Sequence, residues 1–277
     1  MSRIDHRFAA LRAQDRTGLI TFLTAGDPLP AATVAIMHEL VAAGADLIEL
    51  GVPFSDPMAD GPVIQHASER ALAHGVELAT ILGWVREFRQ RDATTPIVLM
   101  GYLNPVEIHG AARFADAAVA AGVDGILLVD CPIEEAATAA PLREAGLQQI
   151  LLAAPTTGEE RLARICAEAA GFLYYVSFAG ITGADRIDVG AVRAHVERLR
   201  QWAKVPVAVG FGIRDATSAQ AIAAFADAVV IGSALVARLA GAASVDEARA
   251  RAREFVAPVR AALDAGTHAR QERHQSN

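Results

Sequence analysis

The sequence predicts a single (β/α)8 barrel of the TIM-barrel class with a short extra N-terminal helix. Eight short apolar runs recur at fairly even spacing, and each is followed by Gly, Pro, Asp or Asn and then by an Ala-rich stretch with helical periodicity. The runs do not alternate with polar residues, which is typical of parallel strands buried on both faces. Eight such units favour closure into a barrel. An open doubly wound sheet is the alternative, but no G-x-G-x-x-G follows the first run.

The elements are expected in a simple order along the chain. Residues 1–14 read MSRIDHRFAALRAQ and form an amphipathic opening helix. We expect one domain over residues 1–265, followed by a polar and irregular tail over 266–277. The eight strands are expected at Leu19–Thr24, Ala45–Leu50, Pro96–Met100, Gly125–Val129, Gln149–Ala153, Phe172–Ser177, Val205–Val209 and Ala228–Ile231.

Composition and net charge argue against several classes of function. The net charge is −7, from 25 Lys+Arg and 32 Asp+Glu, so no global positive field attracts nucleic acid. The two cysteines, Cys131 and Cys166, are too few for a disulfide scaffold and lack zinc-site spacing, so no metal is expected. There is no apolar signal region and no run of about 18 apolar residues. We expect a cytoplasmic enzyme without nucleic-acid or membrane partners.

Barrel enzymes carry their chemistry where the strands end, and the second strand ends on an acid. Glu49 interrupts the apolar run DLIELG and shares a strand face with Leu47. Desolvation there raises the pKa of a carboxyl group toward the range that suits proton transfer. The structural alternative is an ion pair that only stabilises the barrel. Because charged residues are rarely buried without a purpose, we favour a catalytic Glu49.

The loop after this strand is the most specific signal. Residues 53–62 read PFSDPMADGP directly after Glu49-Leu50-Gly51 and Val52. An aspartate in such a loop is usually a turn former or a helix cap, and we interpret Asp56 in that way. The segment as a whole resembles the signature of the α subunit of tryptophan synthase. The resemblance implies that Glu49 is the general acid/base and that Asp60 holds the indole N–H.

The resemblance also implies the reaction and the assembly. Indole-3-glycerol phosphate is expected to undergo retro-aldol cleavage to indole and glyceraldehyde 3-phosphate. Indole would pass to a β subunit in an α2β2 heterotetramer, and pyridoxal phosphate would be bound only by that partner. No cofactor is expected in this chain. Lys204, the only lysine, lies before the seventh strand, which argues against a lysine-imine aldolase.

Glycine-bearing loops follow the last three expected strands, at residues 179–184, 210–213 and 232–234. Barrels commonly bind phosphate in the loops after strands seven and eight, where free N–H groups face the anion. A single Gly pair is more often a plain turn, but three in succession favour phosphate. The resemblance extends from Phe22 to Ser233. It assigns phosphate contacts to Gly183, Gly212, Gly232 and Ser233 and a loop role to Thr182.

The indole moiety requires an apolar pocket. Family positions place Phe22, Tyr102, Tyr174 and Phe211 there, with Tyr175 as the alternative to Tyr174 because a slip of one residue is possible. Core packing is the more common role of any single aromatic side chain.

Other functions stay open at this point. A stand-alone indole-releasing lyase would share the chemistry without a β partner, and a non-catalytic activator of β would not need a desolvated acid. Another barrel acting on phosphorylated intermediates would have to match the 53–62 loop by chance. The expected docking surface comprises the Asp56 loop, residues 104–110 and residues 133–135.

Overall fold

The computed structural model describes the backbone of residues 1–177, 188–210 and 212–275, with side chains up to residue 266. Nine parallel strands form one sheet in the order β5-β4-β3-β2-β1-β9-β8-β7-β6. The strands are β1 Gly18–Thr24, β2 Leu47–Gly51, β3 Ile97–Gly101, β4 Gly125–Leu128, β5 Gln148–Gln149, β6 Leu151–Ala153, β7 Leu173–Val176, β8 Val207–Gly210 and β9 Ala228–Ile231. Each of the eight expected runs contains a strand, so the predicted barrel is confirmed.

The fifth expected run is divided into two short strands. β5 pairs with β4, and β6 pairs with β7. Ile150 separates them, although its N–H still donates to the carbonyl of Ile126 at 2.8 Å. Because β5 and β6 are consecutive pieces of one chain, they join the two ends of the sheet order and close the ring.

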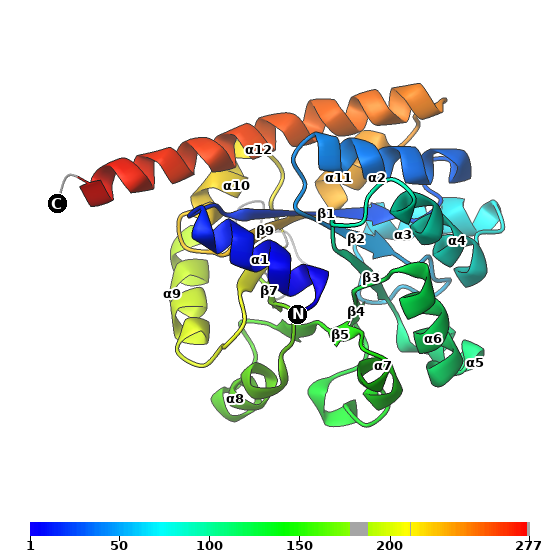
Figure 1. The fold of residues 1–277 in the computed structure, drawn as a ribbon, viewed down its shortest axis with the longest axis horizontal. Helices are drawn as coiled ribbons and strands as arrows, with labels where there is room; N and C mark the ends of the chain where they lie inside the picture. Colours follow the sequence, from blue (N-terminus) through cyan, green and yellow to red (C-terminus); the bar gives the residue numbers. More distant parts are fainter. Residues whose placement is uncertain (178–187, 211, 276–277) are drawn as a thin grey trace.

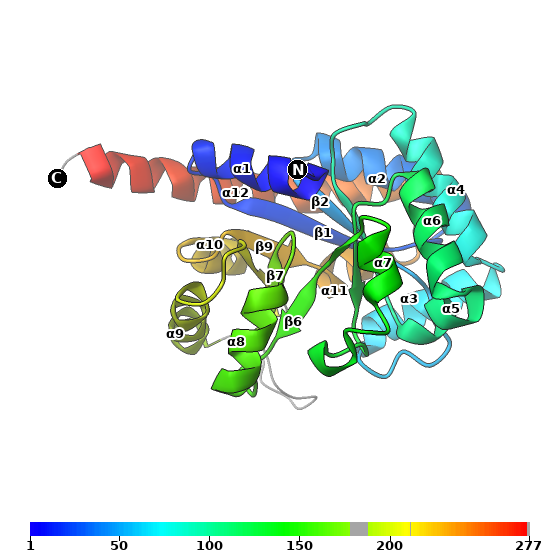
Figure 2. The same cartoon turned by 60° about the horizontal axis from the view of Figure 1, so that its bottom comes forward.

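Helices surround the strand ring on its outside (Figures 1 and 2). They follow the strands in the alternation that the sequence predicts, with extra helices at both ends of the chain. The helices are α1 Arg3–Ala13, α2 Thr33–Ala42, α3 Pro62–Ala73, α4 Leu78–Arg89, α5 Leu103–His109, α6 Ala111–Ala121, α7 Ala140–Glu144, α8 Glu159–Glu168, α9 Val189–Arg200, α10 Ala216–Ala223, α11 Ser233–Leu239 and α12 Val245–Gln275, with 3-10 turns at Pro30–Ala32 and Ile133–Glu135.

The buried apolar side chains form an inner and an outer core. The outer core lies between the strands and the helices. The inner core fills the barrel with side chains such as Ile20, Leu47 and Val98, and Ile4 and Phe8 of α1 belong to it. The expected N-terminal helix is therefore confirmed, and it packs on the barrel interior. A capping box formed by Ser2 and Asp5 begins this helix.

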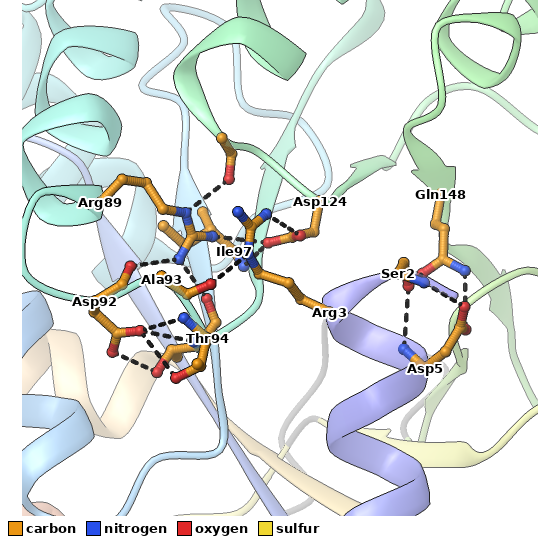
Figure 3. A network of polar contacts seen from close by, with 12 residues as sticks. Ser2, Arg3, Asp5, Arg89, Asp92, Ala93, Thr94, Ile97, Asp124 and Gln148 are labelled. Carbon is orange, nitrogen blue, oxygen red and sulfur yellow. Dashed lines mark hydrogen bonds and ion pairs between the residues drawn. The ribbon is translucent and has the colours of Figure 1, made fainter.

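Aspartates precede three of the strands, and each is bonded to the strand before it. Asp46, Asp124 and Asp227 accept the main-chain N–H of Leu19, Ile97 and Val207, each at 2.8 Å. Each aspartate also forms an ion pair with at least one arginine. Figure 3 shows this for Asp124, which pairs with Arg3 and Arg89 at 2.8 Å each. The carboxylates at this N-terminal end of the barrel are thus paired, and they tie neighbouring strands together.

The C-terminal helix is longer than the sequence predicts. α12 continues to Gln275 and so covers most of the segment 266–277, where we expect an irregular tail. The physical reason is that Ala, Arg, Gln and Glu, which make up half of this segment, are good helix formers even without apolar periodicity. In Figure 1, α12 runs along one side of the barrel, beside α2, α10 and α11, and extends past its edge. Across the described residues, we find no helix with the length and apolar character needed to span a membrane.

Candidate active site

Glu49 lies in β2 with its side chain completely buried, at 0% exposure. It is in register with Phe22 of β1 and Val98 of β3, inside the barrel. Neither carboxyl oxygen has a hydrogen-bond partner among the described residues. Burial without compensation raises the pKa of Glu49 to about 8. The structural alternative of an ion pair is therefore wrong within the described chain, because no cation faces this carboxyl group.

A cavity opens from Glu49 toward the ends of the strands. It joins both predicted carboxylates to two of the predicted aromatic side chains and to three of the predicted phosphate residues. The lining residues are Phe22, Glu49, Asp60, Gly61, Ile64, Met100, Tyr174, Gly212, Ile213, Val230, Gly232 and Ser233. Residues that are far apart in the sequence thus meet in one place at the C-terminal ends of the strands, as the barrel predicts.

Asp60 reaches this cavity from the loop between β2 and α3. The Tyr102 hydroxyl donates to Oδ2 of Asp60 at 3.0 Å and accepts the Ala59 N–H at 3.0 Å. Burial raises the pKa of Asp60, and the hydrogen bond from Tyr102 opposes that rise. Tyr102 also stacks on Phe54, with ring centroids 5.0 Å apart. It lines a small adjoining cavity with Phe22 and Asp60, so the structure places it beside the acid.

The predicted aromatic residues Phe22 and Tyr174 occupy space that glycines leave open. A Cβ at Gly51 would lie 2.5 Å from Cζ of Phe22, and a Cβ at Gly210 would lie 2.1 Å from the Tyr174 hydroxyl. Burial, together with the nearby charges of Glu49 and Asp60, raises the pKa of Tyr174. The choice of Tyr174 over its neighbour is supported, because Tyr175 belongs to the outer core and does not line the cavity.

Three of the predicted phosphate residues, Gly212, Gly232 and Ser233, line the same cavity. Gly212 has a φ of +74°, a conformation that favours glycine. Gly232 precedes the first residue of α11, Ser233, and both line the cavity. The remaining predicted residues, Thr182, Gly183 and Phe211, lie outside the described residues.

Sequence reasoning missed several cavity residues. Met100, Ile64 and Val230 add apolar surface, and Gly51 and Gly210 give the aromatic rings room. Met100 could have been found, because it ends the third expected strand. The two glycines carry no such signal, since only the fold shows which side chain needs their space. No cluster of three or more His, Cys, Asp or Glu side chains suited to a metal ion occurs in the described ranges.

A larger cavity of about 510 Å³ lies at the other end of the barrel, beside α1 and the segments that lead into β8 and β9. Its charged residues include Arg12, Arg200 and Asp227, and Arg200 pairs with Asp227 at 2.8 Å. Helices α1, α9 and α10 end close to this cavity, and basic side chains stabilise helix C-termini. This cavity is larger than the one at Glu49. The cavity at Glu49 contains a buried acid without a partner in the described chain, and we consider such an acid a better indication of an active site than size.

Comparisons with known proteins agree with this geometry. The family model described as tryptophan synthase alpha chain matches residues 8–264. The tryptophan synthase alpha chain of Xanthomonas euvesicatoria pv. vesicatoria (strain 85-10) is 63% identical over 266 residues, which are 95% of this chain and 99% of the relative. That of Xanthomonas axonopodis pv. citri (strain 306) is 62% identical over 268 residues, covering 96% and 100%.

Solved structures are similar as well. Tryptophan synthase subunit alpha from Legionella pneumophila str. Paris superposes with a TM-score of 0.89 at 43% identity, covering 96% of this chain and 99% of that chain. Tryptophan synthase from M. tuberculosis, in an open form with BRD0059 bound, gives a TM-score of 0.84 at 36% identity, with coverage of 95% and 99%. The chain therefore belongs to the tryptophan synthase alpha chain family.

Proposed function

We propose that this protein is a lyase that splits indole-3-glycerol phosphate into indole and glyceraldehyde 3-phosphate, with Glu49 as the proton carrier. One observation carries the assignment of Glu49. Its carboxyl group is fully buried, has no partner in the described chain and opens on the cavity that holds Asp60. A carboxyl group with a pKa of about 8 is protonated at neutral pH, so it enters the reaction as an acid.

The reaction needs two proton transfers and no redox step. The Glu49 carboxyl group gives its proton to C3 of indole, which leaves positive charge on the ring nitrogen. The resulting carboxylate then takes the proton of the hydroxyl group beside the breaking bond. The C–O bond becomes the aldehyde C=O, and the electrons of the broken C–C bond return to the indole ring. Glu49 ends the cycle protonated, as it began.

Asp60 has a different task in this scheme. An ionised carboxylate next to the indole N–H stabilises the positive charge that forms on the nitrogen. The Tyr102 hydroxyl supports the ionised form, because its hydrogen bond lowers the pKa of Asp60 against the effect of burial. Two carboxyl groups in one cavity can thus divide the work, one moving protons while the other stays charged.

The lining of the cavity contains apolar and polar groups that suit the two parts of this substrate. Phe22, Tyr174, Ile64 and Met100 supply apolar surface for the indole ring. Gly212, Gly232 and Ser233 are suited to the phosphate, since glycine lets main-chain N–H groups approach an anion and the serine adds a hydroxyl. We assign Phe211 to the ring and Thr182 and Gly183 to the phosphate loop on the family pattern alone.

We further propose that the protein acts with a tryptophan synthase β subunit and that pyridoxal phosphate is bound there, with no cofactor in this chain. Family membership supports this partnership. Two large apolar side chains are exposed on the expected docking surface, Met58 at 87% and Ile108 at 77%. We propose that the β subunit covers both side chains.

The test measures indole released from indole-3-glycerol phosphate by the purified chain, with and without a β subunit. We expect release that Glu49→Gln abolishes and that the β subunit increases. Glu49→Gln activity near the wild-type rate would disprove the role of Glu49. Co-purification with a β subunit distinguishes an α subunit from a stand-alone lyase, because a stand-alone lyase would neither bind the β subunit nor respond to it.

A further inference from the structure

Gln65 is a residue of the first turns of α3 that no prediction includes. Its side-chain amide donates from Nε2 to the main-chain carbonyl of Asp60 at 2.8 Å, and the carbonyl of Pro57 lies 3.5 Å away. The amide therefore holds the end of the loop that carries Asp60 against the helix that follows it.

The main-chain carbonyl of Asp60 takes no part in the hydrogen bonds of α3. The hydrogen bonds of α3 begin at the carbonyl of Gly61, which accepts the N–H groups of Ile64 and Gln65 at 3.0 Å each. The carbonyl of Asp60 lies outside that ladder, and in the described chain the Gln65 side chain is the only donor that we find for it. A carbonyl left without this donor would change its direction more easily.

Gly61 joins the loop to the helix in extended backbone, with φ −76° and ψ 165°, directly before Pro62. A Cβ at Gly61 would meet nothing within 4 Å, so packing does not explain the glycine. The side chain of Asp60 is held by Tyr102 at 3.0 Å, and its main chain is held by Gln65 at 2.8 Å.

We propose that Gln65 is a positioning residue that fixes the direction of the Asp60 carboxylate through the Asp60 carbonyl. The inference rests on the proposed function, in which Asp60 faces the indole N–H. Gln65 does not line the cavity. Its effect arises because a catalytic carboxylate displaced by about 1 Å loses much of its effect on the rate, up to about a hundredfold.

The test is a double-mutant cycle on indole release, with Gln65→Met to remove the donor at nearly constant volume. We expect Gln65→Met to lower kcat about tenfold and to change KM by less than about twofold. In the Asp60→Asn background the same substitution should lower kcat by less than about twofold, since Gln65 acts only through Asp60. A merely structural role would give the same loss in both backgrounds and would overturn the proposal.

One further variant tests whether a hydrogen-bond donor at position 65 is sufficient, and another serves as a control. Gln65→Lys keeps a donor of similar reach and should restore kcat to within about threefold of wild type. Glu69→Gln is the matched control on the same helix, because Glu69 is exposed and bonds only to His66 in the described structure. Wild-type kcat in Gln65→Met, or no recovery in Gln65→Lys, would contradict the proposal. If wild type releases no indole, the proposed function itself fails, which is a separate outcome.

Discussion

Two glutamates of this chain are both buried and have opposite electrostatic surroundings. Glu39 of α2, 6% exposed, receives Arg253 at 2.6 Å and Arg249 at 3.0 Å. The hydrogen bond from Arg253 is the largest cause that lowers the pKa of Glu39. Glu49, 0% exposed, has no partner in the described chain, and burial raises its pKa to about 8. Burial of an acid alone therefore does not indicate function, whereas burial without a partner does.

The same contrast separates the two ends of the barrel. At the N-terminal ends of the strands, Asp46, Asp124 and Asp227 are bonded to main-chain N–H groups and to arginines. At the C-terminal ends, within the described residues, Glu49 is left unpaired and Asp60 has a tyrosine in place of a cation. One end uses its carboxylates to hold strands together, and the other keeps them available for a substrate.

The largest expected effect separates the two glutamates by activity. Glu49→Gln should reduce kcat by about 10²–10⁴-fold, because that is the usual contribution of proton transfer by a positioned acid. Glu39→Gln should leave kcat within about twofold, since Glu39 lies outside the cavity. Steady-state indole release measures both. A comparable loss in the two variants would contradict the distinction between paired and unpaired acids.

The pH dependence of stability should differ in sign for the same pair. The raised pKa of Glu49 means that its contribution to stability is present below about pH 4.5 and is lost as pH rises through about 8. The lowered pKa of Glu39 means that its contribution is present at neutral pH and is lost on acidification. Glu49→Gln should therefore gain about 4 kcal/mol in the free energy of unfolding over wild type at about pH 8 and little at about pH 4.5, because the pKa of Glu49 rises from 4.5 to about 8. Urea unfolding at the two pH values measures this difference.

The next effect tests the N-terminal end of the barrel. Asp124→Ala removes the carboxylate that pairs with Arg89 and Arg3 and accepts the Ile97 N–H, so it should lower the free energy of unfolding by about 3 kcal/mol. The kcat of the folded fraction should stay near wild type. Asp116→Ala, an exposed aspartate of α6, is the matched control and should cost less than about 0.5 kcal/mol. Thermal unfolding measures the stability of the two variants. A large loss of kcat in Asp124→Ala would contradict the structural role that we assign to the carboxylates at the N-terminal end of the barrel.

A smaller effect is expected where β2 reaches the cavity. Gly51→Ala places a methyl group 2.5 Å from Cζ of Phe22, so the ring must move into the space we assign to indole. The expected result is a rise in KM of about tenfold with stability changed by less than about 1.5 kcal/mol. Gly158→Ala is the control, since a Cβ there meets nothing within 4 Å. An unchanged KM in Gly51→Ala would move the indole ring away from Phe22.

The smallest effect concerns the pH profile. Tyr102→Phe removes the hydrogen bond that lowers the pKa of Asp60, so burial alone should raise that pKa further. Because the scheme requires an ionised Asp60, the acid limb of the kcat/KM profile should move to higher pH. At about pH 7 we expect a loss of about threefold to tenfold. A profile that keeps its acid limb would show that Tyr102 does not set the ionisation of Asp60.

Much of the fold was predictable because it depends on local patterns. The apolar runs and turn residues placed all eight strands, and Glu49 stood out as an acid in an apolar run. Asp60 was predictable only from the PFSDPMADGP loop, since a lone aspartate in such a loop usually forms a turn. Tyr102 was placed near the indole ring, and its bond to Asp60 depends on how β3 and the loop pack together.

Other features required the three-dimensional structure. The aspartates before β2, β4 and β9 act through strands that precede them by about 20 to 27 residues, a link that no local pattern shows. The Gln65 amide and the space over Gly51 and Gly210 are likewise long-range or geometric. The helical end of α12 was missed because its residues favour helix by propensity and not by apolar period.

The most direct test of the central claim is the titration of Glu49 itself. Carboxyl carbons of glutamate, labelled with 13C, are followed by NMR over about pH 3 to 10 in wild type and in Glu49→Gln. We predict one resonance that titrates at about 8 in the free protein and is missing from Glu49→Gln. If every glutamate titrates below about pH 6, Glu49 is ionised at neutral pH, and the account of a buried, unpaired proton carrier is wrong.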